Sequence, residues 1–167
     1  RYRKLLDADF IVLSDTAKAS FNSALALTYT DPEGAIRAYR QALTVEPNLP
    51  KAHSNIGLIL EWQGKVAEAE AEYQKALEKK ADYYPAMANL ANLMVKKGNA
   101  AGAESYLKEK LGKFKQSLTL RNRIAALQHA QGRHEEAARG AMEVLKLDEK
   151  NTAAMIVLAQ AYFSTKK

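Results

Sequence analysis

Residues 53–69 read HSNIGLILEWQGKVAEA, and this stretch decides the fold. Its frame returns at residues 87–103 as MANLANLMVKKGNAAGA and at residues 121–137 as RNRIAALQHAQGRHEEA. Each copy has a glycine at the same place, with a small residue seven positions before it and an alanine five positions after it. These glycines are Gly64, Gly98 and Gly132, 34 residues apart. A period of this length, with its flanks in register, predicts stacked helical hairpins.

The apolar residues on both sides of each glycine recur at helical spacing. Ile56 and Leu60 share one face before Gly64, and a second apolar stripe follows that glycine. Glycine accepts the left-handed backbone conformation that ends a helix and reverses the chain. Two antiparallel helices that cross closely need small side chains at the crossing, and Gly57 and Ala69 supply them. Each unit is therefore expected to be a helix, a tight turn and a second helix.

The period divides the chain into four repeats and two end segments. The predicted repeats are residues 16–49, 50–83, 84–117 and 118–151. Residues 1–15 fit either the second helix of a preceding repeat or an N-terminal cap. Residues 152–167 fit either a lone capping helix, with Leu158 and Tyr162 turned inward, or the start of a fifth repeat. The chain begins at Arg1 without Met and stops in mid-pattern, so we expect a fragment of a longer protein.

These units resemble the tetratricopeptide repeat (TPR), whose pattern is Trp-x-x-Leu-Gly-x-x-Tyr, then Ala-x-x-x-Phe-x-x-Ala, then Pro. The matching residues of the first two units are Ala35, Tyr39, Ala42, Pro47, Ile56, Gly57, Leu60, Ala69, Tyr73 and Ala76. The resemblance covers residues 16–167 and is carried by spacing, since most units lack the tryptophan and the final proline. It implies an all-α fold, a right-handed superhelical solenoid of antiparallel hairpins, and a non-catalytic role in binding proteins.

Composition limits the remaining function classes. Cysteine is absent, which excludes disulfides, thiolate metal sites and cysteine nucleophiles. The three histidines, His53, His129 and His134, lack the spacing of a metal site, and no phosphate-binding glycine loop or catalytic triad stands out. We therefore expect no enzyme activity, no metal and no cofactor. No apolar run reaches the roughly 20 residues of a membrane span, and the compartment stays open between the cytoplasm and a bacterial envelope or periplasm.

Charge is spread unevenly along the chain. Residues 1–83 carry 11 Lys and Arg against 12 Asp and Glu, whereas residues 84–167 carry 14 against 7. A basic half favours an acidic protein or peptide partner. Nucleic acid is not favoured, because aromatic residues are not interleaved with the basic cluster.

The resemblance also implies where a ligand lies, because the first helices of TPR hairpins line the concave groove. Asn55, Asn89 and Arg123 occupy one groove position in successive units, 34 residues apart. Asn92 and Asn122 stand beside them. Asparagine amides both donate and accept hydrogen bonds, so they can hold the backbone of an extended peptide, and an arginine can hold a carboxylate. Further groove positions, at the expected edge, are Lys51, Trp62 and Lys96.

The predicted function is a scaffold or adaptor that binds a peptide or a partner helix during assembly of a multiprotein complex. Two alternatives stay open. The chain could be the targeting module of a larger enzyme, or it could associate with itself through the ends of the solenoid.

Overall fold

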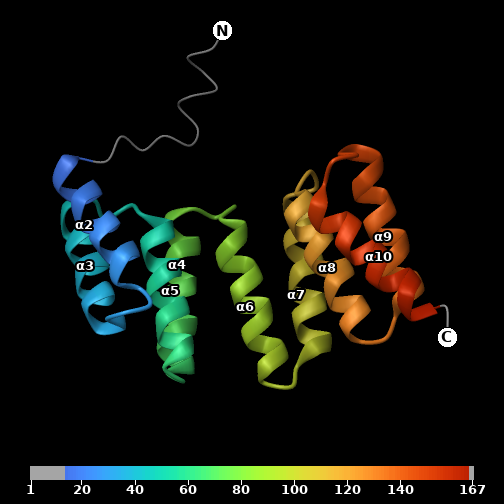
Figure 1. Cartoon of the computed structure of the whole chain (residues 1–167), viewed down its shortest axis with the longest axis horizontal. Helices are drawn as coiled ribbons and strands as arrows, with labels where there is room; N and C mark the ends of the chain where they lie inside the picture. Colours follow the sequence, from blue (N-terminus) through green and yellow to red (C-terminus); the bar gives the residue numbers. More distant parts are fainter. Residues whose placement is uncertain (1–13, 166–167) are drawn as a thin grey trace, which may run out of the picture. The chain divides into compact units, whose positions relative to one another are not determined.

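The computed structural model describes residues 14–165, and this part of the chain is entirely helical apart from its turns (Figure 1). Its nine helices are α2 (Asp15–Leu27), α3 (Pro32–Val45), α4 (Pro50–Trp62), α5 (Val66–Lys79), α6 (Tyr84–Lys96), α7 (Ala100–Lys113), α8 (Leu118–Ala130), α9 (His134–Leu147) and α10 (Thr152–Thr165). The described residues divide into two compact units, the first ending at residue 81 and the second beginning at residue 82. The predicted all-α fold is confirmed. The division into four repeats stays a prediction, and residues 1–13 of the predicted N-terminal segment lie outside the described residues.

The periodic glycines close the turns within three hairpins. Gly64, Gly98 and Gly132 have φ angles of +75°, +81° and +79°. In each hairpin the amide after the glycine donates to a carbonyl five residues earlier. These bonds run from Lys65 to Leu60, from Asn99 to Met94 and from Arg133 to Gln128, each at 2.9 Å. This is the Schellman closure, which needs a left-handed residue and so selects glycine.

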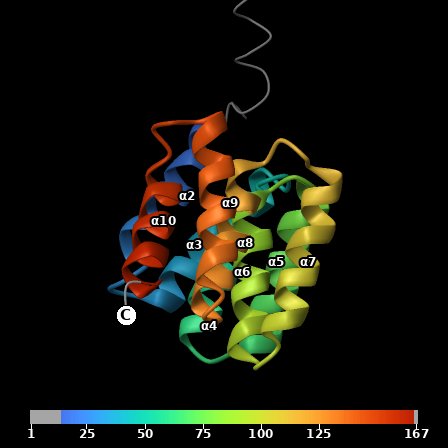
Figure 2. The ribbon, with the colours of Figure 1, turned by 90° about the vertical axis from the view of Figure 1, so that its right-hand side faces the viewer.

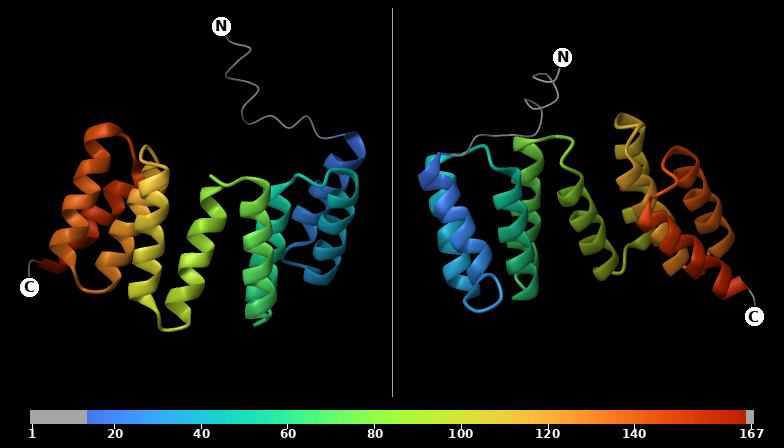
Figure 3. Two further views of the ribbon diagram at one scale, coloured as in Figure 1. Left: turned by 180° about the vertical axis from the view of Figure 1, so that it is seen from behind. Right: turned by 45° about the horizontal axis from the view of Figure 1, so that its top comes forward.

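The first unit contains two antiparallel hairpins, α2 with α3 and α4 with α5 (Figure 3). Gly57 lies against Tyr73 and Ala69 where α4 crosses α5, so the close crossing predicted from small residues is confirmed. Tyr39 and Tyr73 are fully buried. The ring of Tyr39 also packs edge-on against Phe21, with 5.2 Å between ring centroids.

In the second unit, α9 packs against both α8 and α10 (Figure 2). The core here is made of small side chains, which include Ala125, Ala137, Ala141, Val144, Ala154, Val157 and Ala161. Leu158 packs partly against this core, but Tyr162 is 49% exposed, so the prediction that it turns inward is wrong. Tyr162 follows the buried Ala161 by one residue, which places it about 100° further around the helix.

Candidate peptide-binding site

A hollow of about 660 Å³ opens on the second unit beside the first half of α8. Its polar lining comes from Asn122 and Arg123 of α8 and from Asp148, Lys150 and Asn151 of the segment before α10. Its apolar lining is made largely of alanines, namely Ala88, Ala126 and Ala153. Small side chains on three helices leave this space open, while longer polar side chains surround it.

A smaller hollow of about 180 Å³ shares Arg123 and Ala126 with the first. Asn92 and Val95 of α6 and Ala130 of α8 also line it. Arg123 therefore lines both hollows. The structure brings three of the predicted groove residues, Asn92, Asn122 and Arg123, to these two neighbouring hollows.

Arg123 is a partly buried cation that has no partner among residues 14–165. Its Nε is buried with no hydrogen-bond acceptor, and among residues 14–165 no ion pair engages its guanidinium. Burial lowers the pKa of Arg123 below its ordinary value of 12.5, but an arginine remains charged at neutral pH. A partly desolvated cation that lacks a counter-ion is unfavourable in a folded protein, so this group is well suited to an incoming anion.

Asn122 is positioned by a short chain of hydrogen bonds. Its Nδ2 donates to Asn151 Oδ1 at 2.8 Å, and Asn151 Nδ2 donates to Asp148 Oδ2 at 3.0 Å. Asn151 Oδ1 also accepts from Ala154 N at 3.1 Å at the start of α10. Asn122 Oδ1, by contrast, is buried with no donor among the described residues. Within the described residues the site thus holds a cation without a counter-ion, Arg123, and a hydrogen-bond acceptor without a donor, Asn122 Oδ1.

The other groove candidates of the second unit lie on α6. Asn89 is partly buried and Lys96 is exposed. Each already takes part in an interaction with another residue. Neither lines the two hollows described above.

The candidates of the first unit all touch neighbouring side chains. Asn55 Nδ2 donates to the hydroxyl of Tyr39 at 2.9 Å, which ties α4 to α3. Lys51 Nζ lies 5.7 Å from the centroid of the Phe21 ring. Trp62 stacks on Tyr29, with ring centroids 5.5 Å apart. Because Asn55 belongs to one compact unit and Arg123 to the other, their alignment along one groove stays a prediction.

Sequence reasoning did not select Lys150 or Asn151, although both line the larger hollow. A signal was present for Asn151, since asparagine before the apolar helix at Thr152 is a common N-cap. Asn122 lies 29 residues earlier in the chain, and no local pattern links two residues so far apart.

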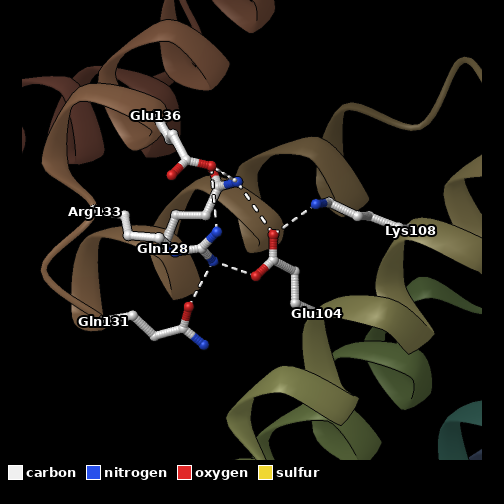
Figure 4. A network of polar contacts seen from close by, with 6 residues as sticks. All are labelled: Glu104, Lys108, Gln128, Gln131, Arg133 and Glu136. Carbon is white, nitrogen blue, oxygen red and sulfur yellow. Dashed lines mark hydrogen bonds and ion pairs between the residues drawn. The ribbon is translucent and has the colours of Figure 1, made fainter.

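A separate polar network joins α7 to the turn between α8 and α9 (Figure 4). Glu104 is buried, forms an ion pair with Lys108 at 2.7 Å and bonds directly to Arg133. Gln128 Nε2 donates to Glu104 Oε1 at 3.3 Å. Burial alone would raise the pKa of Glu104, but the hydrogen bonds from Lys108 and Arg133 outweigh it and hold the pKa below 4.5. Lys108 and Arg133, the charged donors of this network, both pair with Glu104 inside the second unit, so the network is structural.

The histidines form local pairs. His53 Nδ1 lies 2.8 Å from Glu72 Oε2 in the first unit. His129 and His134 meet across the turn at Gly132, with 3.0 Å between their Nδ1 atoms. Within residues 14–165 no group of three or more potential metal ligands occurs. None of the helices in this range is long and apolar enough to span a membrane.

Family models for tetratricopeptide repeats match two parts of this chain. A "TPR repeat" model matches residues 31–64, and a "Tetratricopeptide repeat" model matches residues 63–116. Together they span just over half of the chain. The human protein O-mannosyl-transferase TMTC2 is 39% identical over 69 residues, which is 40% of this chain. The chain spans only 8% of the length of that relative.

Solved structures support the same fold. A tetratricopeptide repeat protein from Parabacteroides merdae aligns over 99% of this chain and 64% of its own, with a TM-score of 0.67 and 17% identity. MamA from Desulfovibrio magneticus RS-1 (residue 41 to its end) aligns over 92% of this chain and 88% of its own, with a TM-score of 0.59 and 16% identity. At this level of identity the likeness concerns the fold alone. With the family matches, the glycine-closed hairpins and the all-α fold in agreement, the chain belongs to the tetratricopeptide repeat family, whose domains generally mediate protein–protein interactions.

Proposed function

We propose that this chain is a non-catalytic scaffold or adaptor that binds an extended peptide or a partner helix and thereby helps to assemble a multiprotein complex. In the second unit the bound segment lies across α6 and α8 and covers both hollows. Its backbone amide donates to Asn122 Oδ1, and an acidic group pairs with Arg123.

The observation that carries this proposal is the unpaired state of Arg123. Nearby Arg121 donates to Lys115 O at 3.1 Å and lies 3.7 Å from Glu143. Arg133 bonds to Glu104 and Glu136. Arg123 lines the hollows and has no such partner in the described part of the chain, so a ligand carboxylate would provide its missing charge-assisted hydrogen bonds.

Local charge favours an acidic ligand as well. Lys150 lines the same hollow as Arg123. The one acidic residue in that lining, Asp148, already accepts hydrogen bonds from Asn151 Nδ2 at 3.0 Å and from Lys150 N at 3.2 Å. The hollow therefore presents two cations against one carboxylate, and each oxygen of that carboxylate already accepts one hydrogen bond.

A peptide-display selection tests this proposal. Random linear peptides are selected on the wild-type chain, and the binders are then measured by fluorescence anisotropy against Arg123→Ala. We expect acidic peptides whose affinity falls about tenfold or more, because one charge-assisted, partly desolvated contact is lost. Arg40→Ala is the matched control, since Arg40 is an exposed arginine on α3.

The selection can also contradict the proposal. Peptides that bind Arg123→Ala and the wild type equally well would place the binding surface elsewhere. Equal losses in Arg123→Ala and Arg40→Ala would indicate attraction by net charge alone.

A second candidate function is suggested by the similarity to O-mannosyl-transferase TMTC2. In that case the repeats act as the targeting module of a larger enzyme and bind its protein substrates or partners. The gene sequence on both sides of residues 1–167 tests this candidate. A catalytic domain in the same reading frame would support it, and a reading frame without one would contradict it.

A further inference from the structure

Two exposed aromatic side chains, Tyr29 and Trp62, stack on each other in the first unit, whereas the residues that support the proposed function lie in the second unit. Tyr29 is 83% exposed and Trp62 is 50% exposed. Their ring centroids are 5.5 Å apart and their planes are inclined by 26°. Tyrosine and tryptophan with large exposed areas are enriched among the residues that dominate protein interfaces.

The backbone around both rings is firmly held. Tyr29 lies in the turn between α2 and α3, where Asp31 N donates to Leu27 O at 2.8 Å and Thr30 N donates to the same oxygen at 3.1 Å. Trp62 is the last residue of α4. The aromatic pair is therefore preorganised, which lowers the entropic cost of binding.

Hydrogen-bond acceptors accompany the pair. Glu33, four residues after Tyr29 in the first turn of α3, accepts from Gln63 Nε2 at 2.9 Å through its Oε1. Gln63 directly follows Trp62, and its own Oε1 is buried without a donor in the range 14–165. The nearby cation Arg37 lies 3.7 Å from Asp31. This edge of the unit thus combines two aromatic rings, a carboxylate and an unsatisfied carbonyl oxygen.

We infer that the surface formed by Tyr29, Trp62, Glu33 and Gln63 binds an arginine side chain of a partner protein. A guanidinium stacks on an aromatic face and is attracted by its π electrons. Its five N–H donors suit the carboxylate of Glu33 and the oxygen of Gln63, which has no donor within residues 14–165. This inference goes beyond the proposed function, because it concerns the first unit and a ligand of opposite charge.

Other ligands fit this surface less well. A nucleic-acid strand would place phosphates beside Glu33 and Asp31, where like charges repel them. A proline-rich segment docks into grooves between aromatic rings, but Tyr29 and Trp62 lie against each other and leave no slot between them. A lysine brings the charge without the planar group that stacks.

Trp62 is the only tryptophan of the chain, so its fluorescence reports directly on this surface. The probe is a short Gly/Ser peptide with a central Arg-Gly-Arg, carrying a dye for anisotropy or left unlabelled for Trp62 emission. Matched peptides replace arginine by citrulline, its neutral isostere, or by lysine. We expect saturable binding of the arginine peptide with a change in Trp62 emission, and affinity about tenfold lower or worse for the citrulline peptide.

Variants test whether binding of the arginine peptide depends on this surface, on any exposed carboxylate, or on the hollows of the second unit. Tyr29→Ala and Glu33→Gln should each lower the affinity for the arginine peptide several-fold. Glu78→Gln, which removes the same charge from an exposed position of α5, should leave binding unchanged. Arg123→Ala should also leave binding of the arginine peptide unchanged. The two proposals can therefore fail independently, because one concerns the arginine peptide and the other the acidic peptides.

Several outcomes would overturn the inference. These are no saturable binding of the arginine peptide, equal binding of the citrulline peptide, or equal losses in Glu33→Gln and Glu78→Gln. A stronger response of Trp62 to an oligothymidylate or to a proline-rich peptide would likewise reassign the surface to that ligand.

Discussion

Gly57 of α4 lies so close to Tyr73 of α5 that a Cβ atom at position 57 would be 2.6 Å from Tyr73 Cε1. The same atom would be 3.1 Å from the carbonyl oxygen of Ala69. The Tyr73 ring is fully buried, and its hydroxyl donates to Glu61 Oε2 at 2.7 Å. The ring is therefore fixed at both ends and cannot move aside.

Gly57→Ala should lower the free energy of unfolding by about 1–3 kcal/mol, because overpacking outweighs the gain in helix propensity. Gly112→Ala in α7 is the matched control, since a Cβ there meets nothing within 4 Å. That change should raise stability by about 0.5–1 kcal/mol. Urea denaturation of both variants measures the difference, and a stabilised Gly57→Ala would show that α4 and α5 do not cross this closely.

Gly98 tests the turn itself. Its φ is +81° and a Cβ would meet nothing within 4 Å, so only backbone strain opposes a side chain. Gly98→Ala should cost about 1–2 kcal/mol. Gly98→Asn should cost less, because asparagine tolerates the left-handed conformation better than alanine does. Thermal unfolding of the two variants gives the order, and equal losses would contradict the strain argument.

The sequence predicts the turns and the helices well because their causes are local. A left-handed glycine and an apolar stripe leave a pattern within one hairpin, as Gly64 and Ile56 do. The contact between Asn55 and Tyr39 leaves no such pattern, since it joins polar atoms 16 residues apart. The stacking of Tyr29 on Trp62 depends equally on the packing of one hairpin against the next. The 34-residue spacing of Arg123 from Asn89 follows from the period, but its lack of a partner within residues 14–165 depends on every side chain around it.

The Asn55–Tyr39 hydrogen bond can be measured by a double-mutant cycle. Asn55→Ala and Tyr39→Phe each remove one side of a 2.9 Å bond whose hydroxyl end is on a fully buried residue. We expect each single change to lower stability by about 0.5–1.5 kcal/mol, with a coupling energy of similar size. A coupling energy of zero would mean that Asn55 and Tyr39 do not interact measurably. The Asn55 amide would then be available to a ligand, as the groove hypothesis from sequence requires.

Glu104 should make stability depend on pH. Its pKa lies below 4.5 in the folded chain, because hydrogen bonds from Lys108 and Arg133 outweigh the opposing effect of burial. A carboxyl whose pKa is lowered by folding stabilises the protein above its unfolded pKa, and this stabilisation is lost as pH falls through the folded value. Glu104→Gln should therefore cost about 1.5–3 kcal/mol at pH 7 and progressively less below pH 4.5.

Denaturation at neutral and acid pH measures this effect. Glu149→Gln, at an exposed glutamate, is the control and should show little difference from the wild type at either pH. If the deficit of Glu104→Gln is the same at both pH values, its carboxylate charge does not stabilise the network.

Arg123 offers the sharpest distinction between a binding residue and a structural one. Burial lowers the pKa of its guanidinium, which means that folding disfavours the charged form. Arg123→Met keeps the packing of the alkyl chain and removes this cost, so stability should hold or rise by up to about 1 kcal/mol.

Arg121→Met is the control on the same helix. It loses the bond to Lys115 O and the contact with Glu143, and should lower stability by about 0.5–1.5 kcal/mol. Binding of an acidic peptide should respond in the opposite order, with the larger loss in Arg123→Met. A clear loss of stability in Arg123→Met would identify it as a structural residue and remove the main support for the peptide site.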